Sequence, residues 1–262
     1  MGKVQTLESG LSLLWKAPKG KINPKNLGWA CPDGTINFAT PEAANQYAKN
    51  TVIKALNTPK PYEQSVVVNG NRIMYEQAGT NGNCTVPLDA EGIWVHGHPD
   101  IFGKGKTTPF SATDYNALMN CKNIDEAVIY NSVGQESRFV KKPKLSFLDK
   151  LLLKLIPSDK YDIIKTQAQI GRACSGYNKT LLDCDAPTYL KLNKLALQRV
   201  IALAKGNTAQ AKKIGREYKK IYDQEVEAAL KDKNVAKRLH KFWEKMQKKL
   251  GVEYSSNFSN LK

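Results

Sequence analysis

Two histidines stand two residues apart within the stretch 92–114, GIWVHGHPDIFGKGKTTPFSATD. The chain has only three histidines, and His96 and His98 directly follow an apolar run that is typical of a β-strand. Because side chains alternate across a strand, these two imidazoles point to the same face. Asp114 follows at the start of a predicted helix, three residues after Ser111. Two imidazoles and one carboxylate suit a hydrolytic Zn²⁺ that keeps a fourth position open for water, so we predict a zinc site of His96, His98 and Asp114.

Each half of this pattern also has a simpler interpretation. A His-x-His pair can be two packing or surface residues. The sequence Ser111-x-x-Asp114 has the form of a capping box, which satisfies free N–H groups at a helix start. Taken alone, the serine and the aspartate favour the cap. The order of strand, His-x-His-Pro, Ser-x-x-Asp and a further strand favours the metal site.

The flanking sequence predicts a compact set of elements around these residues. Thr40 suits a helix N-cap and Pro41 the first helical position, and the helical pattern continues up to Pro59. Asn69-Gly70 between two β-rich runs predicts a hairpin with a type I′ turn, in which both central residues have positive φ. The further predicted elements are the strand that carries the histidines, a helix over 111–121, and a strand pair at 127–130 and 137–140.

The pattern His96-x-His98-Pro99 followed by Ser111-x-x-Asp114 resembles the motif of the JAMM (MPN-type) zinc hydrolases. The resemblance covers about residues 37–142 and implies a mixed sheet flanked by helices. It also implies zinc ligation by the two histidines and the aspartate, and cleavage of a peptide or isopeptide bond, often at a ubiquitin-like C-terminus. The loop between His98 and Ser111 is longer than the usual form of that motif.

The same resemblance implies catalytic roles for two further residues. An upstream glutamate acts as general acid/base on the metal-activated water in that family, and Glu63 lies where it is expected, between the first helix and the first strand. The motif serine supports the tetrahedral intermediate, which assigns that role to Ser111. Glu76, at the far end of the second strand, is the alternative glutamate.

Charge divides the chain into two unequal parts. Residues 1–142 hold 15 basic and 12 acidic side chains, whereas residues 143–262 hold 25 basic and 12 acidic ones, a net charge of +13. The composition changes at the basic, proline-containing stretch 141–144. We therefore predict an α+β chain with an irregular N-terminal extension (1–36), a JAMM-like metallohydrolase domain (37–142) and a basic all-helical domain (143–262). Helices are expected there at 147–156, 187–205, 208–231 and 234–250.

The basic region supports a competing function. A strongly cationic surface can bind nucleic acid without sequence preference, an acidic protein partner or an anionic membrane surface. The predicted helix at 147–156 is amphipathic, which fits either a membrane surface or docking on the catalytic domain, and docking is favoured. The alternative to the zinc hydrolase is therefore a non-catalytic protein that binds nucleic acid or an acidic partner on the same scaffold.

The sequence also predicts the cellular compartment of the protein. No apolar run approaches the roughly 20 residues needed to cross a bilayer, and the N-terminus lacks the features of a signal peptide, so a cytoplasmic location is expected. The five cysteines are scattered and are expected to be mostly free thiols. Met1-Gly2-x-x-x-Thr6 matches a weak N-myristoylation pattern.

Overall fold

The structure is a computed structural model that describes residues 28–142, 157–183 and 185–261. The predicted helix at 147–156, the myristoylation pattern at the N-terminus and Cys184 lie outside the described residues. The other four cysteines are free thiols, as predicted.

The described strands form one mixed sheet in the order β1-β2-β4-β3-β5-β6-β7-β8. Only β5 and β6 are parallel neighbours, and all the other neighbouring pairs are antiparallel. The predicted α+β class is confirmed at this level. The strands are β1 (Trp29–Ala30), β2 (Ile36–Asn37), β3 (Gln64–Asn69), β4 (Arg72–Ala78), β5 (Glu91–Gly97), β6 (Asn123–Tyr130), β7 (Glu136–Lys141) and β8 (Val252–Ser256).

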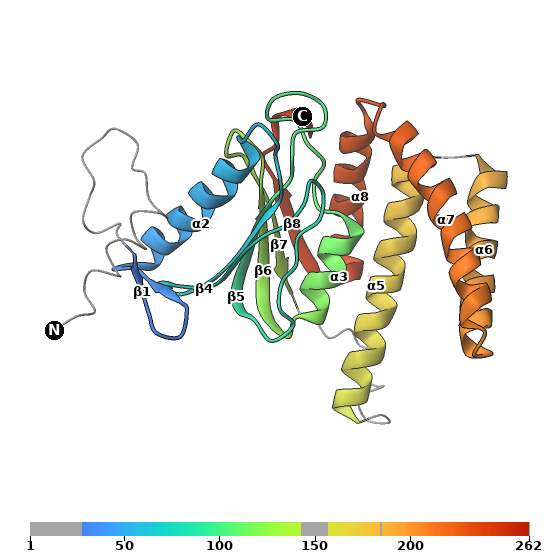
Figure 1. Cartoon of the computed structure of the whole chain (residues 1–262), viewed down its shortest axis with the longest axis horizontal. Coiled ribbons are helices and arrows are strands. Elements are labelled where there is room, and N and C mark those ends of the chain that lie inside the picture. Colours follow the sequence, from blue (N-terminus) through green and yellow to red (C-terminus); the bar gives the residue numbers. More distant parts are fainter. Residues whose placement is uncertain (1–27, 143–156, 184, 262) are drawn as a thin grey trace.

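Among the described residues, the helix α2 (Pro41–Leu56) covers one face of the sheet (Figure 1). Its start follows the sequence pattern, because the Thr40 side chain accepts a hydrogen bond from the Ala43 backbone N–H and Pro41 occupies the first turn. Alternate strand residues such as Val66 and Val95 pack with α2 in one apolar cluster. This face therefore supports the sheet from behind.

The opposite face carries a larger core. The helices α3 (Ala112–Asn120), α5 (Ser158–Leu182) and α8 (Val235–Leu250) contribute to it, and α6 (Ala186–Ala204) and α7 (Thr208–Ala229) lie beyond α5 (Figure 1). Trp94 of β5, Tyr115 of α3 and Trp243 of α8 are buried together in this cluster. The predicted metal ligands lie on this side of the sheet.

The hairpin between β3 and β4 is shifted by one residue from its predicted turn. Asn69 pairs with Arg72, so the two-residue loop is Gly70-Asn71 rather than Asn69-Gly70. Gly70 has φ +58°, whereas Asn71 has a negative φ. Positive φ at the first central position alone is the pattern of a type II′ turn, not of type I′. The prediction of the hairpin is confirmed and that of its turn type is wrong.

The C-terminal region departs from the all-helical prediction. Residues 252–256 form β8, which pairs with β7 and extends the sheet. The long helix α5 was not predicted, although its buried residues Ile170, Ala173, Tyr177 and Leu181 recur at helical spacing. Residues from both sides of position 143 belong to one apolar cluster, so the change of charge there does not coincide with a break in the core.

The N-terminal extension also differs from its prediction. Residues up to 36 were expected to be irregular, but they include β1 and the first residue of β2, which pair with each other at the edge of the sheet. In the ranges that the structure describes, no helix is long and apolar enough to cross a membrane.

Candidate metal centre

The two histidines of the motif lie where β5 ends. His96 is the penultimate residue of β5 and pairs with Ser65 of β3, and His98 follows the strand directly. The His98 backbone N–H donates to the Tyr130 carbonyl at 3.1 Å, which continues the contact with β6 for one more residue. Both side chains are buried, at 0 % and 6 % exposure. The strand therefore fixes two imidazoles on the face of the larger core.

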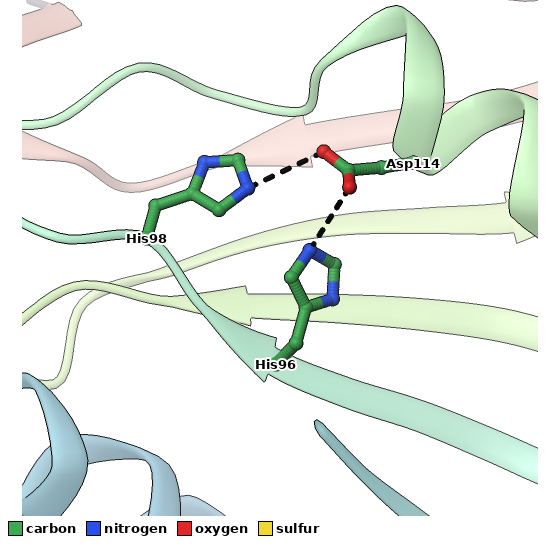
Figure 2. A group of neighbouring side chains, drawn as sticks. All are labelled: His96, His98 and Asp114. Atoms are coloured by element: carbon green, nitrogen blue, oxygen red, sulfur yellow. Dashed lines mark ion pairs between the residues drawn. The ribbon is translucent and has the colours of Figure 1, made fainter. Parts of the chain in front are cut away.

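The carboxylate of Asp114 reaches both rings from the first turn of α3. Asp114 Oδ1 lies 3.3 Å from His96 Nε2, and Oδ2 lies 3.3 Å from His98 Nε2 (Figure 2). One ligand atom from each residue lies within 4.8 Å of the others. The three predicted ligands are thus brought together, although Asp114 lies 16 positions after His98 in sequence.

The same aspartate also closes the capping box at the start of α3. Asp114 Oδ2 accepts from the Ser111 backbone N–H at 2.7 Å, and Ser111 Oγ accepts from the Asp114 backbone N–H at 3.1 Å. The two interpretations of this sequence are therefore compatible. The cap fixes the carboxylate with its oxygens toward the imidazoles, and Ser111 keeps its hydroxyl hydrogen available for a further partner.

A backbone carbonyl orients the second histidine. His98 Nδ1 lies 3.2 Å from the Thr108 carbonyl oxygen, which can only accept, so Nδ1 carries the hydrogen. In the neutral ring, Nε2 then carries a free lone pair, and this nitrogen faces Asp114. A hydrogen bond of this kind is the usual support of a metal-binding histidine.

The long loop that separates the motif halves is itself held in place. Asp100 Oδ2 accepts from the Gly105 N–H at 2.8 Å and from Ser132 Oγ at 2.5 Å. Asn131 donates to the Gly105 carbonyl at 2.6 Å. These contacts with the end of β6 explain how this long loop delivers Ser111 to the histidines.

His96 provides the test of whether these residues fit a metal ion. Its ring stacks on Trp94 with a centroid distance of 4.2 Å, yet neither ring nitrogen has a hydrogen-bond partner among the described residues. The 3.3 Å approach to Asp114 lacks hydrogen-bond geometry. An unsatisfied buried polar atom costs about 1–3 kcal/mol. Coordination of a cation by Nε2 would satisfy that lone pair, and a tetrahedral zinc site with bonds near 2.1 Å places its ligand atoms about 3.4 Å apart.

Charge within the cluster follows from burial and proximity. Burial disfavours the protonated form of His98, but the Asp114 carboxylate outweighs this effect and raises the pKa of His98 to about 9. Burial likewise disfavours an ionised Asp114, but the two neighbouring histidines hold the pKa of that carboxyl well below its usual range. Without a cation the cluster therefore holds a proton on His98, in the place where a metal ion would bind.

Glu63 lies beside the cluster, immediately before β3. Its side chain is buried at 7 % exposure, and burial raises the pKa of its carboxyl although His98 and His96 act in the opposite direction. Burial, together with the nearby carboxylates of Glu63 and Asp114, raises the pKa of the Cys84 thiol. Glu63 is therefore a desolvated carboxylate within electrostatic reach of all three predicted ligands.

The alternative glutamate is placed elsewhere. Glu76 accepts a hydrogen bond from the Tyr47 hydroxyl of α2 at 3.0 Å, on the opposite side of the sheet. Strand alternation explains this, because Tyr75 faces the larger core and its neighbour must face α2. The structure therefore does not bring Glu76, the alternative acid/base, to the three predicted ligands.

Residues of the C-terminal region support the site in a way that the sequence pattern did not indicate. Trp243 Nε1 of α8 donates to the Phe110 carbonyl, directly before Ser111, at 2.8 Å. Tyr115 of α3 donates through its hydroxyl to the Leu250 carbonyl at 2.7 Å. Neither contact could be predicted from the sequence, because every residue has a backbone carbonyl and the residue type does not indicate which donor it accepts from.

Comparison of the chain with protein-family models, with curated proteins and with solved structures finds no match.

Proposed function

We propose that this protein is a zinc-dependent hydrolase that cleaves a peptide or isopeptide bond. The observation that carries the proposal is the convergence of two buried imidazoles and one carboxylate, with both His96 ring nitrogens unsatisfied and Glu63 desolvated beside them. His96, His98 and Asp114 would hold the ion. A zinc ion bound there supplies a water of lowered pKa and polarises the scissile carbonyl.

The residues of the chain supply proton transfer and orientation. Glu63 accepts a proton from the attacking water and returns it to the departing amine, and its raised pKa suits both steps. The Ser111 hydroxyl, which accepts from Asp114 within the cap, retains a hydrogen to donate to the developing oxyanion. Thr108 holds the tautomer of His98 in which Nε2 is unprotonated.

The substrate class comes from the motif resemblance of residues 37–142 to JAMM hydrolases. An isopeptide or peptide bond in a protein, including a bond at a ubiquitin-like C-terminus, is the expected target. The competing function, a non-catalytic protein that binds through its basic region, requires no metal.

Metal analysis combined with a substrate panel separates the two functions. The purified full-length chain is assayed for zinc and incubated with ubiquitin-like conjugates and peptides, with and without a chelator. Cleavage that the chelator stops and zinc restores is expected. A metal-free chain that retains nucleic acid in a salt-sensitive manner would instead support the binding protein.

A further inference from the structure

The helical hairpin α6–α7 presents large aliphatic side chains to solvent. Five residues of α6 stand out because each is at least 44 % exposed, although residues of this type are normally buried. In the part of the chain that the structure describes, no element covers them. They are Leu190, Leu197, Val200, Ile201 and Leu203, which we call the aliphatic face.

These five residues form a single broad arc on the helix. At 3.6 residues per turn they fall within about 160° of the circumference. Leu195 and Ala202 are buried on the opposite side of α6, and the buried Leu192 lies next to the Leu203 edge of the arc. The helix α6 is therefore apolar on two sides, the side that packs on α7 and the outward arc. A helix whose outer side contacts only water does not need an apolar outward arc.

Cations border the aliphatic face on both sides. Lys194 and Lys205 follow it along one edge, and Arg199 lies along the other. Arg199 extends over α7, where the absence of a side chain at Gly215 leaves room for it: a Cβ there would lie 3.3 Å from Arg199 Nε. Residues 186–220 contain nine basic side chains and one acidic one.

A groove between α6 and α7 continues the surface beyond Arg199. It has a volume of about 780 Å³ and an apolar floor that includes Leu203 and Ala211. Its rim carries Arg199, Lys212 and Arg216. No described acidic side chain forms an ion pair with these three cations, which leaves their charge for an anionic ligand.

We propose that the aliphatic face and this groove form a docking surface for an anionic phospholipid membrane. A wide aliphatic arc with cations along both edges is the arrangement of a helix that lies in the membrane interface, where the cations meet lipid phosphates and the aliphatic side chains enter the acyl boundary. The groove rim receives further head groups. This proposal is independent of the metal site.

The observations favour a membrane over the two macromolecules that share its charge complementarity. Nucleic acid would use the cations but would gain nothing from exposed leucines. The stacked Tyr218 and Tyr222 are partly buried and are not presented outward for base stacking. An acidic helix in the groove would leave Leu190, Leu197 and Ile201 uncovered, because they do not line it.

Vesicle flotation with matched variants tests the proposal. The full-length chain, made in a host without N-myristoyltransferase, is mixed with phosphatidylcholine vesicles that contain either no phosphatidylserine or about 30 mol % of it. The test variants are Leu197→Ser/Val200→Ser and Lys212→Glu/Arg216→Glu. The controls are Ile163→Ser/Ile164→Ser, which are similarly exposed on α5, and Lys237→Glu/Lys241→Glu, with the same spacing and charge change on α8.

Binding to the anionic vesicles is expected, with a loss of at least about tenfold in both test variants and little change in both controls. Absence of binding to anionic vesicles, or binding that the test variants retain, overturns the proposal. So does a salt-sensitive affinity for a labelled oligonucleotide that depends on Lys212 and Arg216, is unaffected by Leu197→Ser/Val200→Ser, and occurs without vesicle binding. Circular dichroism verifies that each variant is folded.

Discussion

The carboxylate of Asp114 lies at the start of α3, where its two oxygens face different partners. One oxygen faces His96, and the other lies between His98 and the Ser111 backbone N–H. Helix geometry thus fixes the carboxylate before any ion binds, which lowers the ordering cost of coordination. Residue types and spacing were sufficient to predict this trio. The Thr108 and Phe110 carbonyl contacts were not predictable, because any residue provides a carbonyl.

Asp114→Asn separates the cap from the ligand role. An asparagine retains an oxygen that accepts from the Ser111 N–H, but it lacks the negative charge that a zinc ion requires. We expect zinc affinity to fall by at least about tenfold, with little change in helix content. Competition with a zinc chelator measures the affinity. Zinc retention equal to that of the parent would assign Asp114 to the cap alone.

Glu63→Gln tests the proton-transfer role. The amide is close in shape to the carboxylate but cannot take the proton, so turnover should fall by about 10²–10⁴-fold while zinc remains bound. Glu76→Gln is the matched control, because Glu76 contacts Tyr47 on the opposite side of the sheet from the metal site. The activity of this variant should stay close to that of the parent. Equal losses in the two variants, or none in Glu63→Gln, would remove Glu63 from the mechanism.

The raised pKa of His98 predicts how zinc affinity depends on pH. With a pKa of about 9, His98 carries a proton at neutral pH, and an ion that binds must displace it. The apparent affinity should therefore increase by about tenfold for each unit of pH between 7 and 8.5. Titrations at several pH values measure this slope, and a pH-independent affinity would contradict the proposed ligand role of His98.

Residues of the C-terminal region hold the start of α3 in place, where Ser111 and Asp114 lie. The Phe110 carbonyl accepts from Trp243 of α8, and β8 joins the sheet beside β7. Periodicity and caps predicted α2, α3, α6, α7 and α8 well, because those signals are local. These local signals did not predict β8, because this five-residue strand is defined by its pairing with β7, which lies more than 100 residues away in sequence.

Trp243→Phe tests this support. The substitution keeps an aromatic ring in the core but removes the donor to Phe110, which leaves a buried carbonyl unsatisfied. A loss of about 1–3 kcal/mol in unfolding free energy is expected, together with weaker zinc binding because the 108–114 segment shifts. Tyr254→Phe removes a hydroxyl contact with His240 from the same part of the chain and should leave zinc affinity unchanged. Unaltered zinc affinity in Trp243→Phe would limit its role to stability.

At the scale of the whole molecule, the metal site and the basic hairpin lie on different parts of one structure. The site lies between the sheet and α3, whereas α6 and α7 lie beyond α5 (Figure 1). Charge statistics identified the basic region but not the aliphatic face, because an outward leucine on a helix resembles a core residue until packing is known. The two proposals therefore make separate predictions, and one can fail without the other.

Stability of the metal-free protein should depend on pH through the His98–Asp114 pair. The pKa of His98 is raised from an ordinary value near 6.5 to about 9, so its contribution is complete below pH 6.5 and is lost as the pH rises through 9. A decrease of about 3 kcal/mol is expected across this window, and the decrease should be absent in Asp114→Asn. Urea unfolding of chelator-treated protein at pH 6.5 and 9.5 measures it. An equal decrease in unfolding free energy between these two pH values in the parent and in Asp114→Asn would contradict a stabilising His98–Asp114 ion pair.

Zinc content of the purified full-length chain tests the central claim most directly. Elemental analysis should find one zinc ion per chain in the parent and none in His96→Ala/His98→Ala, with His240→Ala as the control that retains zinc, since His240 contacts Tyr254 outside the site. A parent chain that binds no zinc even when the metal is supplied, or a double variant that binds it as well as the parent, would contradict the account.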